Sequence, residues 1–239
     1  LFITGVSFGL GKRLKKPDDY FTLFQELNIA NYQLRNFRGT FTFSDGQALN
    51  ASYKVALSRN SIDGPIYPRS GSQVTTSLQF TPPYSKFRDA ALNTKDYYTR
   101  ETDQLRLVEY YKYKFTTTWY MPLDRAKKLV LMTKLGFAYL GAYNKDIGFS
   151  PFERFYLGGS GLTGFALDGR EIIALRGYVD QSVGNTNGTG SVVINKYSLE
   201  LRYPLSLNPS ATIYVLGFAD AGNAWVNYKK YSPFDVVRG

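Results

Sequence analysis

The chain has 239 residues and a formal net charge of +10, with 29 Lys and Arg against 19 Asp and Glu. It contains neither Cys nor His, which excludes disulfides, thiolate or imidazole metal sites and His-dependent catalytic dyads. Aromatic residues make up 16% of the sequence, too many for a disordered chain, and the longest apolar runs are far too short for a membrane-spanning helix.

Apolar and polar residues alternate with period two along most of the chain, a pattern typical of β-strands. Residues 197–203, for example, place Tyr and Leu on one face and Ser, Glu and Arg on the other. We predict eight strands in chain order, at residues 1–13, 21–37, 48–60, 72–82, 104–121, 128–143, 191–203 and 211–225.

The length of these segments favours an all-β membrane protein. Several of them are longer than an ordinary soluble strand and long enough to cross a bilayer at a tilt. Many carry Tyr or Trp near their ends, and short turns alternate with longer loops, both typical of outer-membrane barrels. We therefore predict a transmembrane antiparallel β-barrel, with a soluble β-sandwich as the alternative. Because the basic residues are scattered, no nucleic-acid interface is expected.

One connection, residues 144–190, is much longer than the others and holds ten of the 22 glycines. Loops of this length are usually functional. Residues 159–164 (GSGLTG) have the spacing of a dinucleotide-binding fingerprint, but the residues that follow form another turn instead of a helix. We therefore expect no cofactor, and glycines that let the loop fold tightly in a confined space.

Four short motifs lie in this loop and in the two strands after it. They are Gly158-Gly159, Leu175-Arg176-Gly177-Tyr178, Ser198-Leu199-Glu200 and Phe218-Ala219-Asp220. The alternation places Glu200 on the polar face, which we expect to line the barrel interior. Asp220 is in phase with apolar residues such as Leu216 and Phe218, so it should face inward only if a bulge or strand end intervenes at Gly217 or Gly222.

Together these motifs resemble the BamA family of outer-membrane protein assembly factors. The Gly-Gly pair followed by Leu-Arg-Gly-Tyr resembles the conserved sixth extracellular loop of that family, and the next two strands are similar to the strands that follow it. The turn Tyr67-Pro68-Arg69-Ser70-Gly71 resembles the family's Phe-Pro-x-x-Gly turn. The length of the glycine-rich insertion is similar to that of the family's members in Bacteroidota.

The resemblance implies that residues 1–239 are part of a larger protein. They would form the sixth to thirteenth strands of a 16-stranded barrel, with the terminal strands and the periplasmic POTRA domains absent. There is also a physical reason to expect more than eight strands. The interior of an eight-stranded closed barrel is filled by its own side chains. It leaves no room for the loop of residues 144–190 to fold inward.

The family also implies a function and a role for Arg176. Its members fold and insert β-barrel proteins into the outer membrane, without nucleotide, together with accessory lipoproteins. Carried over to this sequence, Arg176 would contact Glu200 and Asp220 and so order the loop. Combining Arg176→Glu with Glu200→Arg would then partly restore an ion pair that a single substitution breaks. The expected partners are unfolded β-barrel clients, accessory lipoproteins and outer-membrane lipid, and the lateral gate would lie outside this chain.

Other functions fit the sequence less well. A polypeptide secretion pore of the same superfamily shares the loop motif, and an ordinary outer-membrane channel shares the strands but not the motif. An enzyme is least expected, because without His or Cys a site would need paired carboxylates or a Ser–Lys dyad, and the sequence suggests neither.

Overall fold

The computed structural model describes residues 1–36, 45–88, 107–145, 147–160, 171–184, 188–208 and 210–238. The strands are β1 (Phe2–Arg13), β2 (Phe21–Leu34), β3 (Gly46–Asn60), β4 (Gly71–Phe80), β5 (Tyr111–Pro122), β6 (Val130–Gly141), β7 (Phe155–Leu157), β8 (Glu171–Ile173), β9 (Val193–Asn208), β10 (Ala211–Trp225) and β11 (Val237–Arg238). These ranges also contain α1 (Tyr84–Arg88) and two 3-10 turns, η2 (Pro151–Glu153) and η3 (Tyr228–Lys230). None of the described helices has the length and hydropathy to cross a membrane.

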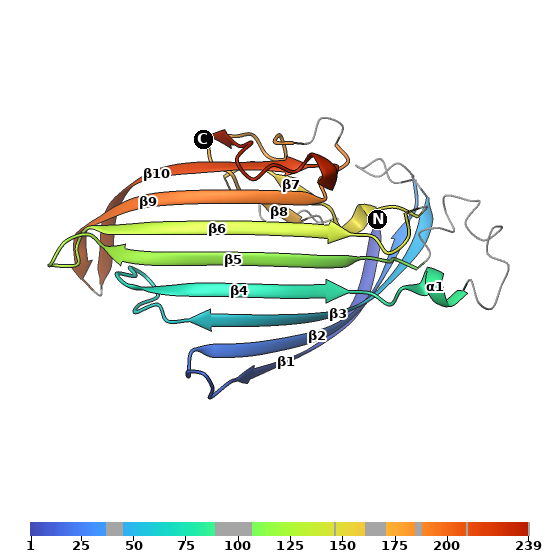
Figure 1. Ribbon diagram of the computed structural model, residues 1–239, viewed down its shortest axis with the longest axis horizontal. Coiled ribbons are helices and arrows are strands. Elements are labelled where there is room, and N and C mark those ends of the chain that lie inside the picture. The colour runs from blue at the N-terminus through green and yellow to red at the C-terminus, as the bar shows by residue number, and fades with distance from the viewer. Residues whose placement is uncertain are drawn as a thin grey trace.

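Nine of the strands form one antiparallel sheet in the order β1-β2-β3-β4-β5-β6-β9-β10-β11. The sheet is curved, with β1 and β11 at its two edges (Figure 1). Its eight long strands have 10 to 16 residues each, enough to cross a bilayer at a tilt. The all-β class and all eight predicted strands are thus confirmed.

The strand boundaries differ most from the prediction at the fifth strand. It was expected from residue 104, but residues 104–106 lie outside the described ranges and β5 begins at Tyr111. The residues just before β5 pair elsewhere. The N–H of Val108 donates to the carbonyl of Leu49 at 3.0 Å, and the carboxylate of Glu109 accepts hydrogen bonds from Ser85. Tyr110 then pairs with Thr81, the residue after β4, whose N–H donates to the Tyr110 carbonyl at 3.0 Å, and the ladder with β4 begins at Tyr111.

The two faces of the sheet have opposite character, and the strand register assigns each side chain to one of them. One face is apolar and largely exposed; it includes Val6, Phe8, Leu10, Leu27, Ile29, Leu78, Trp119, Met121, Leu199, Leu201 and Val215. The other face carries polar or charged residues, among them Asn50, Ser52, Gln79, Lys112, Lys114, Lys196, Ser198, Glu200 and Asp220. A sheet that is apolar outside and polar inside is the arrangement of a transmembrane barrel wall.

The polar face is covered by the described residues between β6 and β9, here called the inner loop (142–145, 147–160, 171–184 and 188–192). In Figure 1 its strands β7 and β8 lie behind the β6–β9–β10 region, on the concave side of the sheet. These two strands pair in parallel, and the sequence pattern did not predict them because each has three residues. The polar face is therefore the inner face, and we use that name below.

A small apolar core holds the inner loop at one end of the sheet. Phe155, Leu157 and Leu175 from the loop are fully buried, together with Leu140 of β6 and Ile194 of β9. Burying side chains of this size stabilises the docked loop by roughly 1.5–3 kcal/mol each. The inner loop is thus a packed part of the domain. Apolar contacts attach it, and its polar contacts determine its position on the sheet.

Candidate functional site

Arg176 of the inner loop is bound to two carboxylates on neighbouring strands. Its Nε and Nη2 donate to Asp220 Oδ2 at 2.7 Å and Oδ1 at 2.8 Å, and its Nη1 donates to Glu200 Oε1 at 2.7 Å. The Asp220 side chain is fully buried, that of Glu200 is 8% exposed and that of Arg176 is 27% exposed. Such a paired guanidinium gives strong, directional contacts. We call Arg176, Glu200 and Asp220 the arginine clamp.

Further contacts fix each partner of the arginine clamp. The Arg176 guanidinium lies over the Phe218 ring, 3.8 Å from its centroid. Arg202 Nη2 donates to the second Glu200 oxygen at 2.6 Å, so Glu200 is shared by two guanidinium groups. Hydrogen bonds to Asp220, and then those to Glu200, raise the pKa of Arg176 above its usual value in spite of partial burial. The arginine therefore stays charged at every physiological pH.

The expectation that Asp220 needs a bulge to face inward is wrong. The register between β9 and β10 runs without a shift from Tyr214 to Trp225, past both Gly217 and Gly222. Asp220 faces inward because its apolar phase partners also do: Phe218 lies under Arg176, and Tyr214 packs on Tyr67. Both faces of β10 carry apolar side chains, so apolar alternation could not show which face is inner.

The glycine pair contacts the Leu-Arg-Gly-Tyr segment directly. The N–H of Gly159 donates to the Tyr178 carbonyl at 3.0 Å, and Gly159 also forms a bridge with Leu175. Gly158 has φ +131°, and a Cβ on it would lie 2.3 Å from the Val179 carbonyl oxygen. Only glycine permits this approach. The structure thus joins two motifs that lie 16 or more residues apart in sequence.

A second ionic cluster, which the sequence did not suggest, holds the other side of the inner loop. Lys112 of β5 is 4% exposed, and its Nζ lies 3.1 Å from Glu153 Oε2 and 2.9 Å from Glu171 Oε2. Lys114 Nζ contacts the other oxygen of Glu171 at 2.8 Å, and Asn50 of β3 donates to Glu153 at 2.9 Å. We call Lys112, Glu153 and Glu171 the lysine clamp.

Electrostatics favour the charged form of the lysine clamp. Burial alone would raise the pKa of Glu171, but the nearby charges of Lys112 and Lys114 outweigh it and lower that pKa to about 2. Two contacts with aromatic rings support the same region. Tyr32 stacks on Phe152 with ring centroids 4.6 Å apart, and Lys112 lies over the Phe155 ring. The inner loop is therefore attached from β2 to β10, across most of the sheet.

The turn that carries Tyr67-Pro68-Arg69-Ser70-Gly71 folds over the opposite end of the inner face. The Tyr67 hydroxyl donates to the Lys128 carbonyl at 2.9 Å, and its ring packs on Tyr214. Asp63 accepts hydrogen bonds from the backbone of Arg69 and Ser70, and although burial opposes it, these bonds lower the pKa of Asp63. This turn is rigidly held by its own hydrogen bonds.

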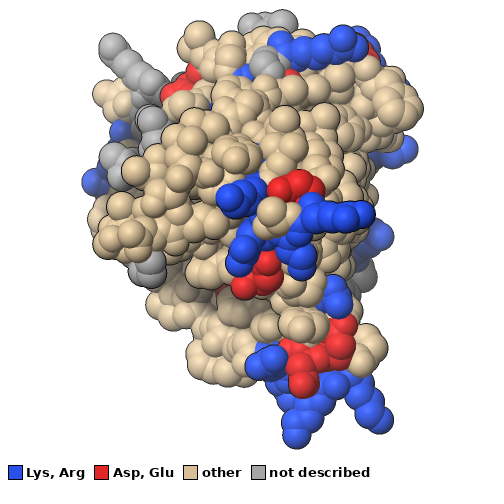
Figure 2. Space-filling model, turned by 90° about the vertical axis from the view of Figure 1, so that its left-hand side faces the viewer, with Lys and Arg blue, Asp and Glu red and all other residues tan. Residues whose placement is uncertain are grey.

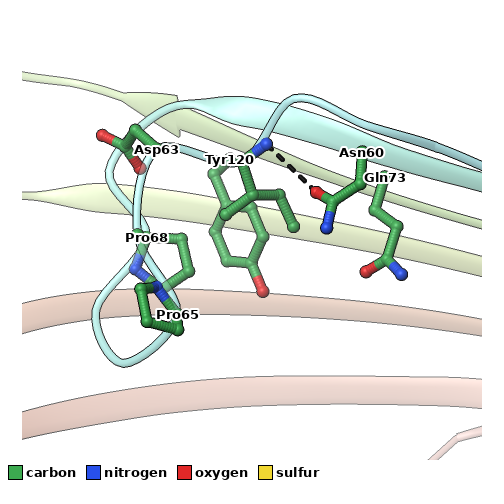
Figure 3. Close-up of a pocket in the computed structure, with 8 residues that line it drawn as sticks. Asn60, Asp63, Pro65, Pro68, Gln73 and Tyr120 are labelled. Atoms are coloured by element: carbon green, nitrogen blue, oxygen red, sulfur yellow. Dashed lines mark hydrogen bonds between the residues drawn. The ribbon is translucent and has the colours of Figure 1, made fainter. Parts of the chain in front are cut away.

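Beside this turn is a cavity of about 440 Å³. Figure 3 shows Pro65 and Pro68 of the turn on one side, Tyr120 in the middle and Gln73 with Asn60 on the other. Arg202 lies 5.4 Å from the centroid of the Tyr120 ring. The arginine clamp is therefore connected through Arg202 to the wall of this cavity.

The structure places the remaining motif residues as follows. Leu175 is fully buried in the loop core, Gly177 has φ +88°, and the Tyr178 hydroxyl donates to the Arg238 carbonyl at 2.9 Å. Residues 161–164, the rest of the rejected dinucleotide fingerprint, lie outside the described residues. Among the described residues no group of acidic side chains could hold a metal ion. The site is an attachment of a loop to a wall, built from ion pairs and close backbone contacts.

Comparison with known proteins agrees with this architecture. The Omp85 superfamily domain matches residues 3–238. The outer membrane protein assembly factor BamA of Neisseria meningitidis serogroup B (strain ATCC BAA-335 / MC58) is 26% identical over 185 residues, which cover 76% of this chain and 20% of that protein. This chain therefore spans about a fifth of the length of that curated relative.

A solved structure extends the likeness to the fold. The crystal structure of BamA from Haemophilus ducreyi lacking POTRA domains 1–3 matches with a TM-score of 0.62 and 19% identity, over 97% of this chain and 45% of that chain. The superfamily match covers nearly the whole sequence, and the curved antiparallel sheet agrees with it. The chain is a member of the Omp85 superfamily and forms part of a BamA-like β-barrel domain.

Proposed function

We propose that the protein to which this chain belongs folds β-barrel proteins and inserts them into the bacterial outer membrane, without using a nucleotide. The observation that carries the proposal is the arginine clamp, which fixes the Leu175–Tyr178 segment to β9 and β10. The similarity to an outer membrane protein assembly factor supports the same function. The partners would be unfolded barrel clients, accessory lipoproteins of the assembly machinery and the lipids of the outer membrane.

In this proposal the chain supplies a rigid wall and an ordered inner loop. Unfolded barrel clients need a free strand edge with which to pair, because unpaired backbone groups are costly in a bilayer. A seam can open at one place only if the rest of the barrel keeps its shape. The two clamps attach the inner loop from β2 to β10, so the wall described here would resist deformation while a seam elsewhere in the barrel opens.

The inner loop also argues for insertion over general permeation. An open channel needs an unobstructed, water-filled interior, whereas this loop is packed against the inner face by apolar contacts and by both clamps. A barrel occupied in this way is a poor route for solutes. It is suited to a task performed at the wall and not through the centre.

The test is depletion of the full-length protein in its own cell, followed by quantification of the other outer-membrane barrels. The proposal predicts a broad fall of these barrels and accumulation of their unfolded precursors in the periplasm. Loss of one secreted protein with normal barrels would identify a secretion pore of the same superfamily and overturn the proposal. No change in either would indicate a channel and would overturn it equally.

A further inference from the structure

Exposed basic side chains gather at one end of the sheet, where the short turns lie. The β1–β2, β3–β4 and β5–β6 turns are all at the left end of the molecule in Figure 1, and Figure 2 looks directly at that end and shows Lys and Arg projecting from it in groups. Six exposed basic residues belong to these three turns: Lys15, Lys16, Arg69, Arg125, Lys127 and Lys128. We call them the basic turn surface.

The acidic residues of the same turns are used differently. Asp63 and Asp124 each accept hydrogen bonds from two backbone N–H groups of their own turn. Asp18 accepts one from the N–H of Tyr20 and a second bond from Arg59. The ion pairs found among the described residues involve none of the six basic side chains. Three of the four carboxylates in these turns thus hold the turns, the fourth, Asp19, is exposed, and the cations project toward solvent.

The position of the basic turn surface relative to the apolar outer face identifies its partner. Leu10, Met121 and Leu123 are between 45% and 63% exposed; Leu10 and Met121 lie in the last four residues of their strands, and Leu123 is the first residue after β5. Trp119, 47% exposed on the outer face near the same end, is the type of residue that marks a bilayer interface. Lys and Arg just beyond such a band lie within a Debye length of the lipid headgroups.

The distribution of the charges favours lipid over a protein partner. The six residues come from three separate turns, and none of them lines the cavity beside the β3–β4 turn. Figure 2 shows the basic side chains at this end in more than one group, with acidic side chains between them. A ring of separate lipid headgroups around a barrel can contact such a surface at each turn. A folded acidic protein would need a continuous complementary patch with buried anchors at its centre.

We propose that the basic turn surface binds the phosphates of anionic phospholipids in the leaflet that faces the short turns, and so selects these lipids around the barrel. The inference rests on the proposed outer-membrane location and is independent of the insertion activity. It assigns a role to residues that neither clamp uses.

The test measures lipid selectivity of the full-length protein reconstituted in nanodiscs of phosphatidylethanolamine and phosphatidylglycerol. Electron paramagnetic resonance with spin-labelled forms of each lipid gives their relative association constant at the protein surface. The turn variant combines Lys15→Gln, Lys16→Gln, Lys127→Gln and Lys128→Gln. The matched control combines Lys86→Gln, Lys145→Gln, Lys229→Gln and Lys230→Gln, four exposed lysines outside these turns, with the same change of charge. A Lys-to-Arg version of the turn variant keeps the charge.

We expect the wild-type protein, the control and the Lys-to-Arg version to prefer phosphatidylglycerol about tenfold at low salt, and the turn variant to lose this preference. High salt should remove it from all of them. Unchanged selectivity in the turn variant, or equal loss in the control, would overturn the inference. Unchanged selectivity together with loss of a co-purifying accessory subunit would assign the surface to an acidic protein instead. Intact barrels after depletion would refute the proposed function but would leave this result standing.

Discussion

Arg176 and Asp220 lie 44 residues apart in the chain and meet through two side-chain hydrogen bonds of 2.7 and 2.8 Å. A third bond, from the Arg176 backbone N–H to Asp220 Oδ2 at 3.3 Å, ties the main chain of the inner loop to the same carboxylate. Glu200 accepts one hydrogen bond from Arg176 on its first oxygen, and its second oxygen accepts from Arg202. Asp220 is therefore the principal anchor of the arginine clamp, and Glu200 the secondary one.

This asymmetry predicts unequal effects of two neutral substitutions. Asp220→Asn should weaken docking of the inner loop by about 2–4 kcal/mol, because it removes the fully buried partner of a partly buried guanidinium. Glu200→Gln should cost about 1 kcal/mol, because Arg176 keeps Asp220. Hydrogen–deuterium exchange of loop amides 171–184 in the full-length protein measures both. Equal effects would show that the two carboxylates are interchangeable.

The structure also revises the expected outcome of a charge exchange. Combining Arg176→Glu with Glu200→Arg should fail to restore docking, although the sequence suggested partial rescue. The new carboxylate would face Asp220, and the new guanidinium would face Arg202. We expect exchange protection in the double variant to be no higher than in Arg176→Glu alone. Recovery to near wild-type protection would contradict the observed geometry.

The lysine clamp predicts a second, independent loss. Lys112→Met should weaken docking by about 3 kcal/mol, because Glu153 and Glu171 would be left without their shared buried cation. Lys114→Met is the matched control: the Lys114 side chain is 32% exposed and its ammonium contacts only one of these carboxylates, so its loss should cost less than about 1 kcal/mol.

Because the two clamps share no residue, Lys112→Met and Arg176→Ala should be additive in the same exchange measurement. If the loop is docked as strongly in the double variant as in the less stable of the two single variants, one clamp alone holds the loop.

Acid should release this part of the inner loop in a defined pH range. The docked pKa of Glu171, about 2, is below the value of about 4.3 expected for a solvated glutamate. Its contribution to docking is therefore fully present above about pH 4.3 and is lost as the pH falls toward 2. Loop proteolysis by pepsin between pH 5 and 2 would follow this loss. Glu171→Gln should remove part of the pH dependence, and an unchanged profile would exclude Glu171 as the titrating group.

The glycine pair offers a test that involves no charge. Gly158→Ala should undock the close approach of Gly158 to Val179 at a cost of at least about 2 kcal/mol, because the new Cβ would lie 2.3 Å from the Val179 carbonyl oxygen at a φ of +131°. Gly217→Ala is the control, since a Cβ there meets no atom within 4 Å. Thermal stability of the two variants, compared with loop protection, separates a local from a global effect. Equal protection in both would show that Gly158 is not required.

Much of the fold could be predicted from the sequence because strand alternation is a local signal. The alternation at 197–203 placed Glu200 on the inner face correctly, since Leu199 and Leu201 on the opposite face are exposed. It failed at Asp220, because β10 carries apolar residues on both faces. There the inner position of Asp220 came only from the family resemblance, and the reason for it from the contacts of Phe218 and Tyr214.

The lysine clamp shows where such reasoning ends. Lys112 and Lys114 are two residues apart on β5, so both lysines lie on one face of that strand. Their partners Glu153 and Glu171 lie in the inner loop, where strands of three residues have no detectable period. Contacts between a regular strand and an irregular loop depend on the tertiary fold and have no local sequence signal.

The most direct test of the whole account measures insertion with the purified full-length protein in lipid vesicles. An unfolded barrel client is added, and its folding is followed by the change in its electrophoretic mobility without heating. We predict that the wild-type protein and Lys114→Met accelerate folding equally. Combining Arg176→Ala with Lys112→Met should lower that acceleration about tenfold or more. Full acceleration by the double variant would contradict a role for the clamped loop, and no acceleration by the wild-type protein would contradict the proposed function itself.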